Sequence, residues 1–337
     1  MNASVTLGPD AQVLVTGATG FIGSELVRQL SATGARVRAI ARPSSDRTEL
    51  DRLGVEVVVG NVYDPAVVDK ALLGVNYIFH VASGFREAGI PDEEHRRVNV
   101  DSTQLLARGA ASLDGFARFV HVSTVGVHGH IENPPADESA PFAPGDIYQI
   151  TKVEAEEWIR SFAAEKSLPL TVVRPAPVYG PGDLRLLKVF KFAKLRFVPL
   201  IGWSKGLFHL VHVEDLVRFM VLAASSDEAL GEIFICGNVE PTSIKGMVRS
   251  VAEHLGTKPT FVRIPAAPVF LVARIVEALC KAVSIEPPIY PRRVAFFTKD
   301  RSFDTTKARS LPGFELHYDN ESGIAMTVDW YREKGLL

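Results

Sequence analysis

Three side chains in the middle of the chain have the types and spacing needed to move a proton to or from a substrate hydroxyl. Tyr148 and Lys152 lie four residues apart in a run with helical periodicity, so both project from one face. A protonated Lys152 favours the ionised tyrosinate, which helps Tyr148 exchange a proton near neutral pH. Such pairs also occur by chance on many helices. Thr124 supports a catalytic role for the pair. It offers a hydroxyl at the end of a β-rich run, at the sheet edge where ligands of open α/β folds bind.

A glycine-rich segment near the N-terminus has the pattern of a dinucleotide-binding turn. The residues TGATGFIG at 16–23 directly follow a β-rich run and open a helical stretch, a context that disfavours the alternative of an ordinary glycine-rich turn. Gly17 allows the sharp bend, Gly20 lets the backbone approach a pyrophosphate, and Gly23 allows close packing of helix on strand. The helix N-terminus adds N–H groups and a dipole that favour an anion. The predicted cofactor contacts are Gly17, Thr19, Gly20, Phe21, Ile22 and Gly23.

The end of the second β-rich run bears on which dinucleotide binds. NAD binding usually places a carboxylate here to accept from the ribose 2′-OH, whereas a 2′-phosphate needs Arg and hydroxyl donors. Ala41 stands at the expected acidic position, and Arg42, Ser44 and Ser45 follow it. The sequence therefore favours NADP(H), with NAD possible. The alternative interpretation is that Arg42 is a solvated loop charge.

These groups need a scaffold that gathers the ends of several β-rich runs. The first half of the chain alternates short Val/Ile/Phe-rich runs with helical stretches, which predicts an α/β fold with a doubly wound parallel sheet. The candidate strands are Gln12 to Thr16, Arg36 to Ala41, Val55 to Gly60, Val75 to Ala82, Phe116 to Ser123 and Leu170 to Arg174. The candidate helices are Ser24 to Thr33, Pro65 to Leu73, Glu93 to Ser112 and Ile147 to Glu165.

After Gly180 the pattern becomes less regular. Two further strands, at Leu207 to Val213 and Gly231 to Cys236, are expected to rejoin the sheet. The other expected elements are Leu184 to Arg196, Glu214 to Ser225, Ser243 to Gly256, Phe261 to Ile264, Pro268 to Ser284 and Glu321 to Lys334. We predict a dinucleotide-binding domain at residues 1–180 and 207–238, and a smaller, mostly helical substrate lobe at 181–206 and 239–337.

Five motifs in this order resemble the extended short-chain dehydrogenase/reductases, the NAD(P)-dependent epimerase/dehydratase superfamily with a Rossmann sheet. They are TGATGFIG, His121-Val-Ser-Thr124, Tyr148-x-x-x-Lys152, the segment Arg174 to Asp183, and the segment Phe208 to Asp215. The resemblance covers nearly the whole chain. It implies that Thr124 orients the substrate oxygen, that Tyr148 is the general acid/base, and that Lys152 holds the nicotinamide ribose and tunes Tyr148.

The same resemblance implies further site residues. Asn99 matches a helix Asn associated with the proton relay, although a helix Asn bonded to water is the alternative. The implied cofactor contacts are Asn61 and Val62 at the adenine, Ala82 and Ser83 at the ribose and phosphates, and Pro175 and Val178 at the nicotinamide face. A homodimer through the helices that carry Asn99 and Tyr148 is also implied.

Two departures from the family pattern disfavour two of its subclasses, the dehydratases and the sugar-nucleotide epimerases. Val125 and Gly126 follow Thr124 where dehydratases have Asp-Glu, and Pro177 replaces the Asn with which sugar-nucleotide epimerases commonly hold a diphosphate. The C-terminal segments are instead similar to the 3β-hydroxysteroid and sterol dehydrogenase branch. They are Glu286 to Phe297, Arg301 to Ala308 and Asp329 to Gly335.

The expected substrate lobe holds both apolar and basic side chains. Phe190, Phe192, Phe197, Trp203 and Phe208 predict an apolar pocket, whereas Lys188, Lys191, Lys194, Arg196 and Lys205 fit either a diphosphate site or a solvated basic face. The stretch Pro268 to Ser284 is apolar except for one polar stripe. We interpret it as a core helix with one solvated face. The alternatives are a border of an apolar pocket and contact with a membrane surface.

Composition excludes several other classes of function. The 337 residues carry a net charge of −2, with no basic run that would track nucleic acid, and Cys236 and Cys280 have no metal-ligand spacing. No secretory signal and no apolar run of roughly 18 residues is found, so we predict a cytoplasmic protein without a metal and without integral membrane association.

We predict that the protein is an NADP(H)-dependent oxidoreductase that acts on a secondary alcohol or ketone. The expected substrate is hydrophobic and resembles a hydroxysteroid. The alternative is an NAD(P)-dependent nucleotide-sugar epimerase. A third hypothesis is a non-catalytic NADP sensor, against which the complete set of Thr124, Tyr148 and Lys152 argues.

Overall fold

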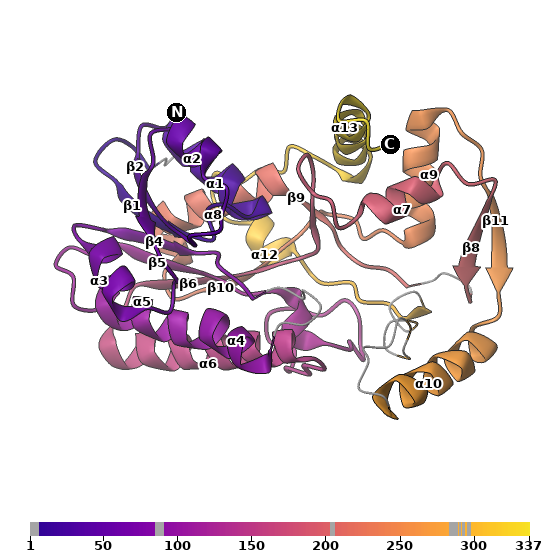
Figure 1. The fold of residues 1–337 in the computed structure, drawn as a ribbon, viewed down its shortest axis with the longest axis horizontal. Helices are drawn as coiled ribbons and strands as arrows, with labels where there is room; N and C mark the ends of the chain where they lie inside the picture. The colour runs from indigo at the N-terminus through magenta and orange to yellow at the C-terminus, as the bar shows by residue number, and fades with distance from the viewer. Residues whose placement is uncertain are drawn as a thin grey trace.

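A parallel sheet of seven strands forms the centre of the molecule. The computed structural model describes residues 7–84, 91–202, 206–282, 289, 291, 294 and 298–337. The strand order is β10-β6-β5-β4-β1-β2-β3 (Figure 1). The bounds are β1 Gln12–Thr16, β2 Arg36–Ala41, β3 Glu56–Val59, β4 Tyr77–His80, β5 Arg118–Val122, β6 Leu170–Pro175 and β10 Ile233–Cys236. Central strands such as β5 are buried throughout, because helices cover both faces.

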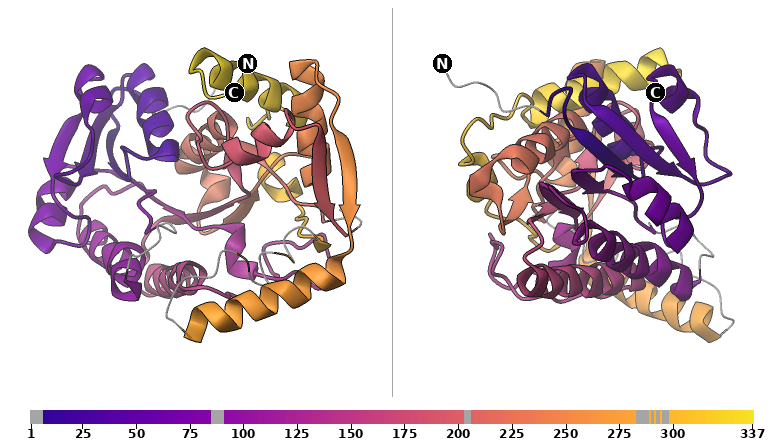
Figure 2. Two further views of the ribbon diagram at one scale, coloured as in Figure 1. Left: turned by 45° about the vertical axis from the view of Figure 1, so that its right-hand side comes forward. Right: turned by 90° about the vertical axis from the view of Figure 1, so that its left-hand side faces the viewer.

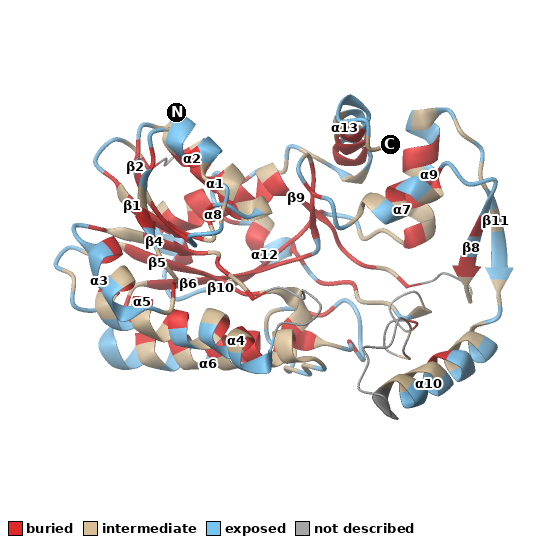
Figure 3. Cartoon of the chain, in the orientation of Figure 1, coloured by how far each residue is buried: buried red, intermediate tan, exposed pale blue. Residues whose placement is uncertain are grey.

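Two helical layers enclose this sheet (Figures 1 and 3). One layer contains α1 (Phe21–Ala32) and α8 (Val213–Ser225), with the short α2 (Thr48–Arg52) beside them. The other contains α3 (Pro65–Leu72), α5 (Ser102–Ala110) and α6 (Ile147–Lys166). The predicted doubly wound α/β fold is therefore confirmed.

Two predicted elements take a different form in the structure. The helix expected over Glu93 to Ser112 is divided into α4 (Asp92–Arg96), a π-helical turn at Arg97–Asp101, and α5. The strand expected over Leu207 to Val213 does not rejoin the main sheet. Only β9 (Val211–His212) forms there, and it pairs with β7 (Val178–Tyr179), whereas β10 pairs with the outer edge of β6.

The C-terminal lobe has its own core. It packs α7 (Leu187–Phe192), α9 (Ile244–Leu255) and α13 (Asn320–Glu333) around Tyr331 and Val251. A two-stranded parallel sheet of β8 (Phe197–Ile201) and β11 (Thr260–Ile264) extends it, and β8 was not predicted from the sequence. The segment containing α12 (Thr306–Arg309) crosses back, and its Ala308 packs with the core of the main sheet.

The helix α10 (Ala266–Ala282) follows β11 and runs along the outside of the molecule (Figure 2). Among its residues whose burial the structure describes, only Ala273 is buried, so the interpretation as a core helix is wrong. No other layer of the described chain covers its outer face. In the described part of the chain, no helix has the length and hydropathy to cross a bilayer.

Candidate active site

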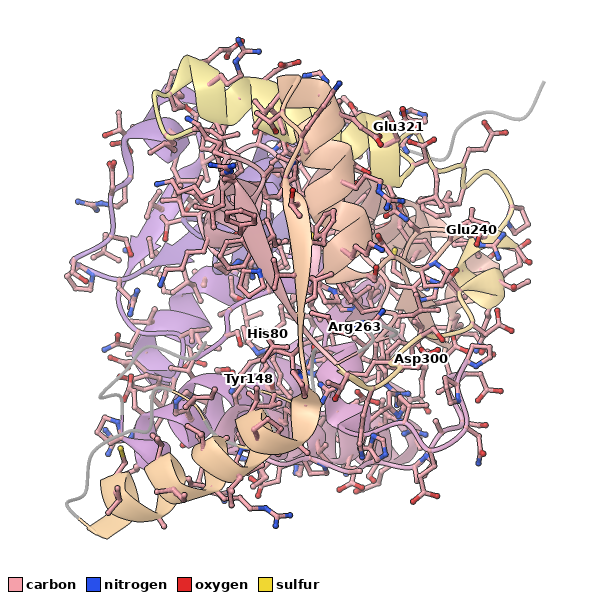
Figure 4. The ribbon with its side chains drawn as sticks, turned by 90° about the vertical axis from the view of Figure 1, so that its right-hand side faces the viewer. His80, Tyr148, Glu240, Arg263, Asp300 and Glu321 are labelled. Carbon is pink, nitrogen blue, oxygen red and sulfur yellow. The ribbon has the colours of Figure 1, made fainter. Side chains whose placement is uncertain are left out.

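The predicted site residues gather at the carboxyl edge of the main sheet. The strand order reverses at β1, which has β2 on one side and β4 on the other, and this switch point is where ligands of open α/β sheets bind. Figure 4 views the molecule from the C-terminal lobe and shows His80 and Tyr148 in the region behind β11 and α10. The sheet edge with its predicted acid/base groups therefore faces the lobe.

The glycines of the first turn allow backbone contacts that a side chain would prevent. Gly17 has a φ of 71°, and a Cβ there would lie 2.8 Å from the Ala82 nitrogen. A Cβ on Gly23 would lie 2.0 Å from the Gly17 carbonyl oxygen. The turn after β1 is thus pressed against both the first turn of α1 and the loop after β4. This side-chain-free backbone fits a dinucleotide pyrophosphate.

The helix α1 begins at Phe21, three residues before its predicted start at Ser24. Gly20 is its N-cap residue, with neither a capping side chain nor an acidic residue in the first turn. Thr19 and Gly20 are exposed, and Phe21 and Ile22 are half-buried. The first N–H groups of the helix and its positive dipole end are therefore available to an anion.

A buried hydrogen-bond network that the sequence analysis missed ties the ends of β1 and β4 together. The Ala82 N–H donates to the Thr16 hydroxyl oxygen at 3.1 Å, and Thr16 Oγ1 lies 2.8 Å from His80 Nδ1. His80 Nε2 lies 3.0 Å from Thr103 Oγ1. Burial, with a smaller effect of Lys152, lowers the pKa of His80 to about 3, so the imidazole is neutral. The only sequence signal is that Thr16 ends its predicted strand and that His80 lies near the end of its own.

Asn99 is a buried connector between the β4 loop and α6. Its Oδ1 accepts from the Gly84 N–H at 3.0 Å and from the Ser83 hydroxyl at 3.3 Å, and its Nδ2 donates to Thr151 Oγ1 at 2.9 Å. Asn99 lies in the π-helical turn, a distortion often found at functional sites. Protein groups thus bond to the amide oxygen of Asn99 and to one of its amide hydrogens.

The amino end of α6 presents the predicted acid/base pair. Asp146 caps the helix by accepting from the Gln149 N–H at 2.9 Å, and half-buried Tyr148 lies in the first turn. Lys152 is buried and donates from Nζ to the Val122 carbonyl oxygen at 2.9 Å, which fixes the ammonium at the end of β5. Thr124 follows two residues later and is half-buried, with its Oγ1 accepting from the Gly126 N–H at 3.1 Å. The positive end of the helix dipole also favours a tyrosinate at this position.

A second residue pair missed by sequence reasoning lies one turn beyond Lys152. Glu156 is fully buried and accepts from Arg174 Nε at 3.1 and 3.2 Å. Arg174 also donates to the Glu138 carbonyl oxygen at 2.8 Å. Burial lowers the pKa of Lys152 to about 8, and the charge of Glu156 opposes that shift. The repeat of 148, 152 and 156 at intervals of four was the available signal.

The buried ammonium of Lys152 predicts a pH-dependent stability. Its folded pKa of about 8 lies below its unfolded value of 10.5, so the unfolded state binds more protons between these pH values, and stability rises with pH there. Relative to Lys152→Met, the parent should gain about 2 kcal/mol of unfolding free energy between pH 8 and pH 10. Urea unfolding of both proteins at these two pH values measures the difference. Parallel pH profiles would contradict it.

The predicted adenosine contacts lie at the ends of β2 and β3. Ala41 is buried as the last residue of β2, and its carbonyl accepts from the Gly60 N–H at 3.0 Å. Arg42 and Ser44 are exposed, while Ser45 is half-buried and closes the turn through its N–H to the Arg42 carbonyl at 3.0 Å. Beyond β3, Asn61 is half-buried and Val62 is buried.

The carboxylates near the ends of β2 and β3 already accept hydrogen bonds from protein groups. The Asp46 carboxylate accepts from the Thr48 N–H at 3.0 Å and from its hydroxyl at 2.7 Å. These bonds lower the pKa of Asp46. Asp64 caps α3 by accepting from the Ala66 N–H at 3.0 Å.

On the nicotinamide side, the structure brings together only part of the expected set. Pro175 ends β6 and Val178 begins β7, and both are buried. Phe190 and Phe208, expected in an apolar pocket, are buried in the core of the C-terminal lobe, and Phe197 is exposed. Trp203 and Lys205 lie outside the described residues. Phe190, Phe197 and Phe208 therefore do not build the expected apolar pocket.

A separate cavity of about 550 Å³ lies at the opposite edge of the sheet. Gln12, Arg36 and Glu56 border it at the amino ends of β1, β2 and β3. Ligands of open α/β sheets bind outside the carboxyl ends, so we assign this cavity no part in the reaction. Among the described residues, no group of three or more His, Cys, Asp or Glu side chains is placed to hold a metal ion.

The chain is similar to known proteins in sequence and in fold. Residues 13–237 match the NAD dependent epimerase/dehydratase family. Sterol demethylase protein B of Methylococcus capsulatus is 30% identical over 96% of this chain and 99% of its own length. Ceramide reductase of Caulobacter vibrioides is 28% identical over 96% of each protein. The crystal structure of gox2253 superposes with a TM-score of 0.82 at 29% identity, covering 97% of this chain and 99% of that one.

The matched residues span the glycine-rich turn, the Tyr148 and Lys152 pair and the last strand of the main sheet. The match therefore covers most of the chain and includes the elements that hold the candidate site. This protein belongs to the NAD-dependent epimerase/dehydratase family, the extended short-chain dehydrogenase/reductases.

Proposed function

We propose that the protein is an NADP(H)-dependent oxidoreductase that interconverts a secondary alcohol and a ketone on a predominantly apolar substrate. The observation that carries this proposal is the placement of Tyr148 at the amino end of α6, one turn before a buried Lys152 bonded to the end of β5. This pair lies at the same sheet edge as the Gly17 turn, so a proton donor and a dinucleotide site share one edge.

Each residue of the candidate site has a separate role in the proposed reaction. The dinucleotide, when bound, supplies or accepts the hydride. Tyr148 holds the proton of the substrate hydroxyl, and Lys152 stabilises its ionised form. Thr124 orients the substrate oxygen, and Asn99 positions α6 against the β4 loop through Thr151 and Gly84.

The proposed preference for NADP(H) rests on the turn after β2. The strand ends with Ala41 rather than an acidic residue, and exposed Arg42 and Ser44 offer donors to a 2′-phosphate. Asp46, the nearest carboxylate further along the turn, is occupied by Thr48. NAD binding remains the alternative, in line with the name of the family.

A titration with both dinucleotides tests this preference. We expect NADP(H) to bind at least about tenfold more tightly than NAD(H), because each charge-assisted contact contributes roughly 1.5–3 kcal/mol. Ala41→Asp should reverse the order by repelling the 2′-phosphate, and Arg42→Ala should weaken NADP(H) binding without weakening NAD(H) binding. Arg36→Ala, at the exposed start of the same strand, is the matched control. Equal affinities in the parent protein would overturn the preference.

An apolar substrate is supported by the names of the relatives. Sterol demethylase protein B and ceramide reductase are named for a sterol and a ceramide, which are both apolar lipids. Pro177 is consistent with this, because it has no amide side chain, and its carbonyl is occupied by the Val211 N–H at 3.1 Å. Lys188 and Lys191 are exposed on α7, so the nucleotide-sugar epimerase remains a second candidate.

A substrate panel separates the two candidates. Apolar ketones, hydroxysteroids and ceramide-like ketones are compared with UDP- and dTDP-sugars, while NADPH absorbance and sugar stereochemistry are followed together. Oxidation of NADPH by an apolar ketone is the expected result. Inversion of a nucleotide sugar without net NADPH change would establish the epimerase instead.

We also propose a homodimer through the segments that carry Asn99 and Tyr148, as the family resemblance implies; these are the π-helical turn between α4 and α5, and α6. Light scattering across a concentration series measures the mass directly, and a monomer at micromolar concentration would contradict the proposal.

A further inference from the structure

The outer face of α10 exposes large apolar side chains. The exposed fractions are 60% for Leu271, 52% for Val272, 52% for Ile275 and 64% for Leu279. Their spacing of three and four residues places them along one side of the helix. A helix of this composition usually packs its apolar side against a core, so this side is a candidate contact surface.

The neighbouring two-stranded sheet also exposes apolar side chains. Pro199 of β8 pairs with Val262 of β11, and both are exposed, as is Phe197 at the start of β8. The chain then passes directly from β11 into α10 (Figures 1 and 4). Seven of the twelve exposed large apolar side chains of the described residues belong to this region. They are Leu195, Phe197, Val262, Leu271, Val272, Ile275 and Leu279, which we call the α10 surface.

The segments that build this region carry positive charge. Residues 184–213 and 254–282 contain ten Lys and Arg residues and one acidic residue, Glu277 of α10, although the whole chain has a net charge of −2. The side chains of Lys191, Lys194, Arg196 and Lys258 are exposed. The guanidinium of Arg196 lies 5.3 Å from the centre of the Phe197 ring, so charge and apolar surface are adjacent.

This combination of apolar and basic side chains matches the chemistry of an anionic lipid surface. Helices that lie in the plane of a bilayer combine an apolar side with Lys and Arg, and their binding increases with anionic lipid. A second copy of the chain fits poorly, because a twofold contact would set this basic region against itself. At 1.5 Å per residue, the 17 residues of α10 extend about 25 Å, enough to lie along a bilayer surface.

We propose that the α10 surface binds anionic lipid bilayers, with α10 lying parallel to the membrane plane and its apolar side chains inserted between the lipid headgroups. The binding requires neither dinucleotide nor substrate, so it does not depend on the proposed function. Such docking would place the lipid on the outer side of the lobe, and the sheet edge that carries Tyr148 faces the inner side of the same lobe.

Vesicle co-sedimentation of the full chain tests the proposal. Vesicles of phosphatidylcholine alone are compared with vesicles containing 30% phosphatidylglycerol. We expect binding to the anionic vesicles that weakens with added salt. The double substitution Leu271→Gln with Leu279→Gln should lower the partition coefficient at least about tenfold, since apolar contacts drive insertion. The matched control is Leu73→Gln with Leu230→Gln, two leucines exposed by 67% and 50% elsewhere, which should leave binding unchanged.

Two further measurements test the contribution of the basic side chains and check that each variant is folded. Lys191→Glu with Lys194→Glu should abolish the preference for anionic vesicles, and thermal unfolding of every variant shows that the fold is intact. Absence of binding to anionic vesicles, or equal binding by the parent and the Leu271→Gln, Leu279→Gln variant, would overturn the proposal. A concentration-dependent dimer lost in that variant, without vesicle binding, would show instead that a second copy occupies the surface.

Discussion

Replacing Tyr148 with Phe should lower turnover by roughly 10²–10⁴-fold while leaving the fold and dinucleotide affinity nearly unchanged. The substitution keeps the aromatic ring in the first turn of α6 and removes only the hydroxyl that exchanges the proton. Steady-state kinetics with the best ketone from the substrate panel measures the effect, and dinucleotide titration confirms that the cofactor site is intact.

Two comparisons show that the loss arises from proton transfer. Thr124→Ala should act in the same direction, because it removes the hydroxyl that orients the substrate oxygen. Tyr63→Phe, which removes another partly buried phenol bonded to Glu94 at 3.0 Å, should change turnover little. Turnover of Tyr148→Phe within a factor of about three of the parent would show that the acid/base assignment is wrong.

Replacing Glu156 with Ala should cost about 3–5 kcal/mol of unfolding free energy. The substitution leaves the Arg174 guanidinium buried without its carboxylate, and Arg174 is only 1% exposed. It also removes the charge that raises the pKa of Lys152, so the alkaline limb of the turnover profile should move to lower pH. Urea unfolding and a pH–rate profile measure the two effects separately.

The same helix offers a control for this prediction. Glu154 pairs with Arg96 at the surface, where an ion pair contributes at most about 1 kcal/mol, so Glu154→Ala should change stability little. Combining Glu156→Leu with Arg174→Met removes both buried charges and should restore much of the stability lost in Glu156→Ala. A loss below about 1 kcal/mol in Glu156→Ala would mean that the buried pair does not stabilise the fold.

Local patterns in the sequence determined much of the dinucleotide-binding half. β1 and β2 have the predicted bounds Gln12–Thr16 and Arg36–Ala41, and Gly231 to Cys236 rejoins the sheet as β10. These elements are predictable because continuous apolar runs, helix periodicity and glycine turns all act within a few residues. The same holds for the 148–152 spacing and for the glycine-rich turn.

Contacts between distant segments were decided only by the tertiary structure. The bonds between Thr16 and His80 and between Glu156 and Arg174 join residues 64 and 18 positions apart, which no local pattern specifies. The pairing of β9 with β7 likewise joins residues 33 positions apart, such as Val178 and Val211. The exposure of α10 was also unpredictable, because apolar periodicity shows that a helix has an apolar side but not which neighbour, if any, the folded chain places against it.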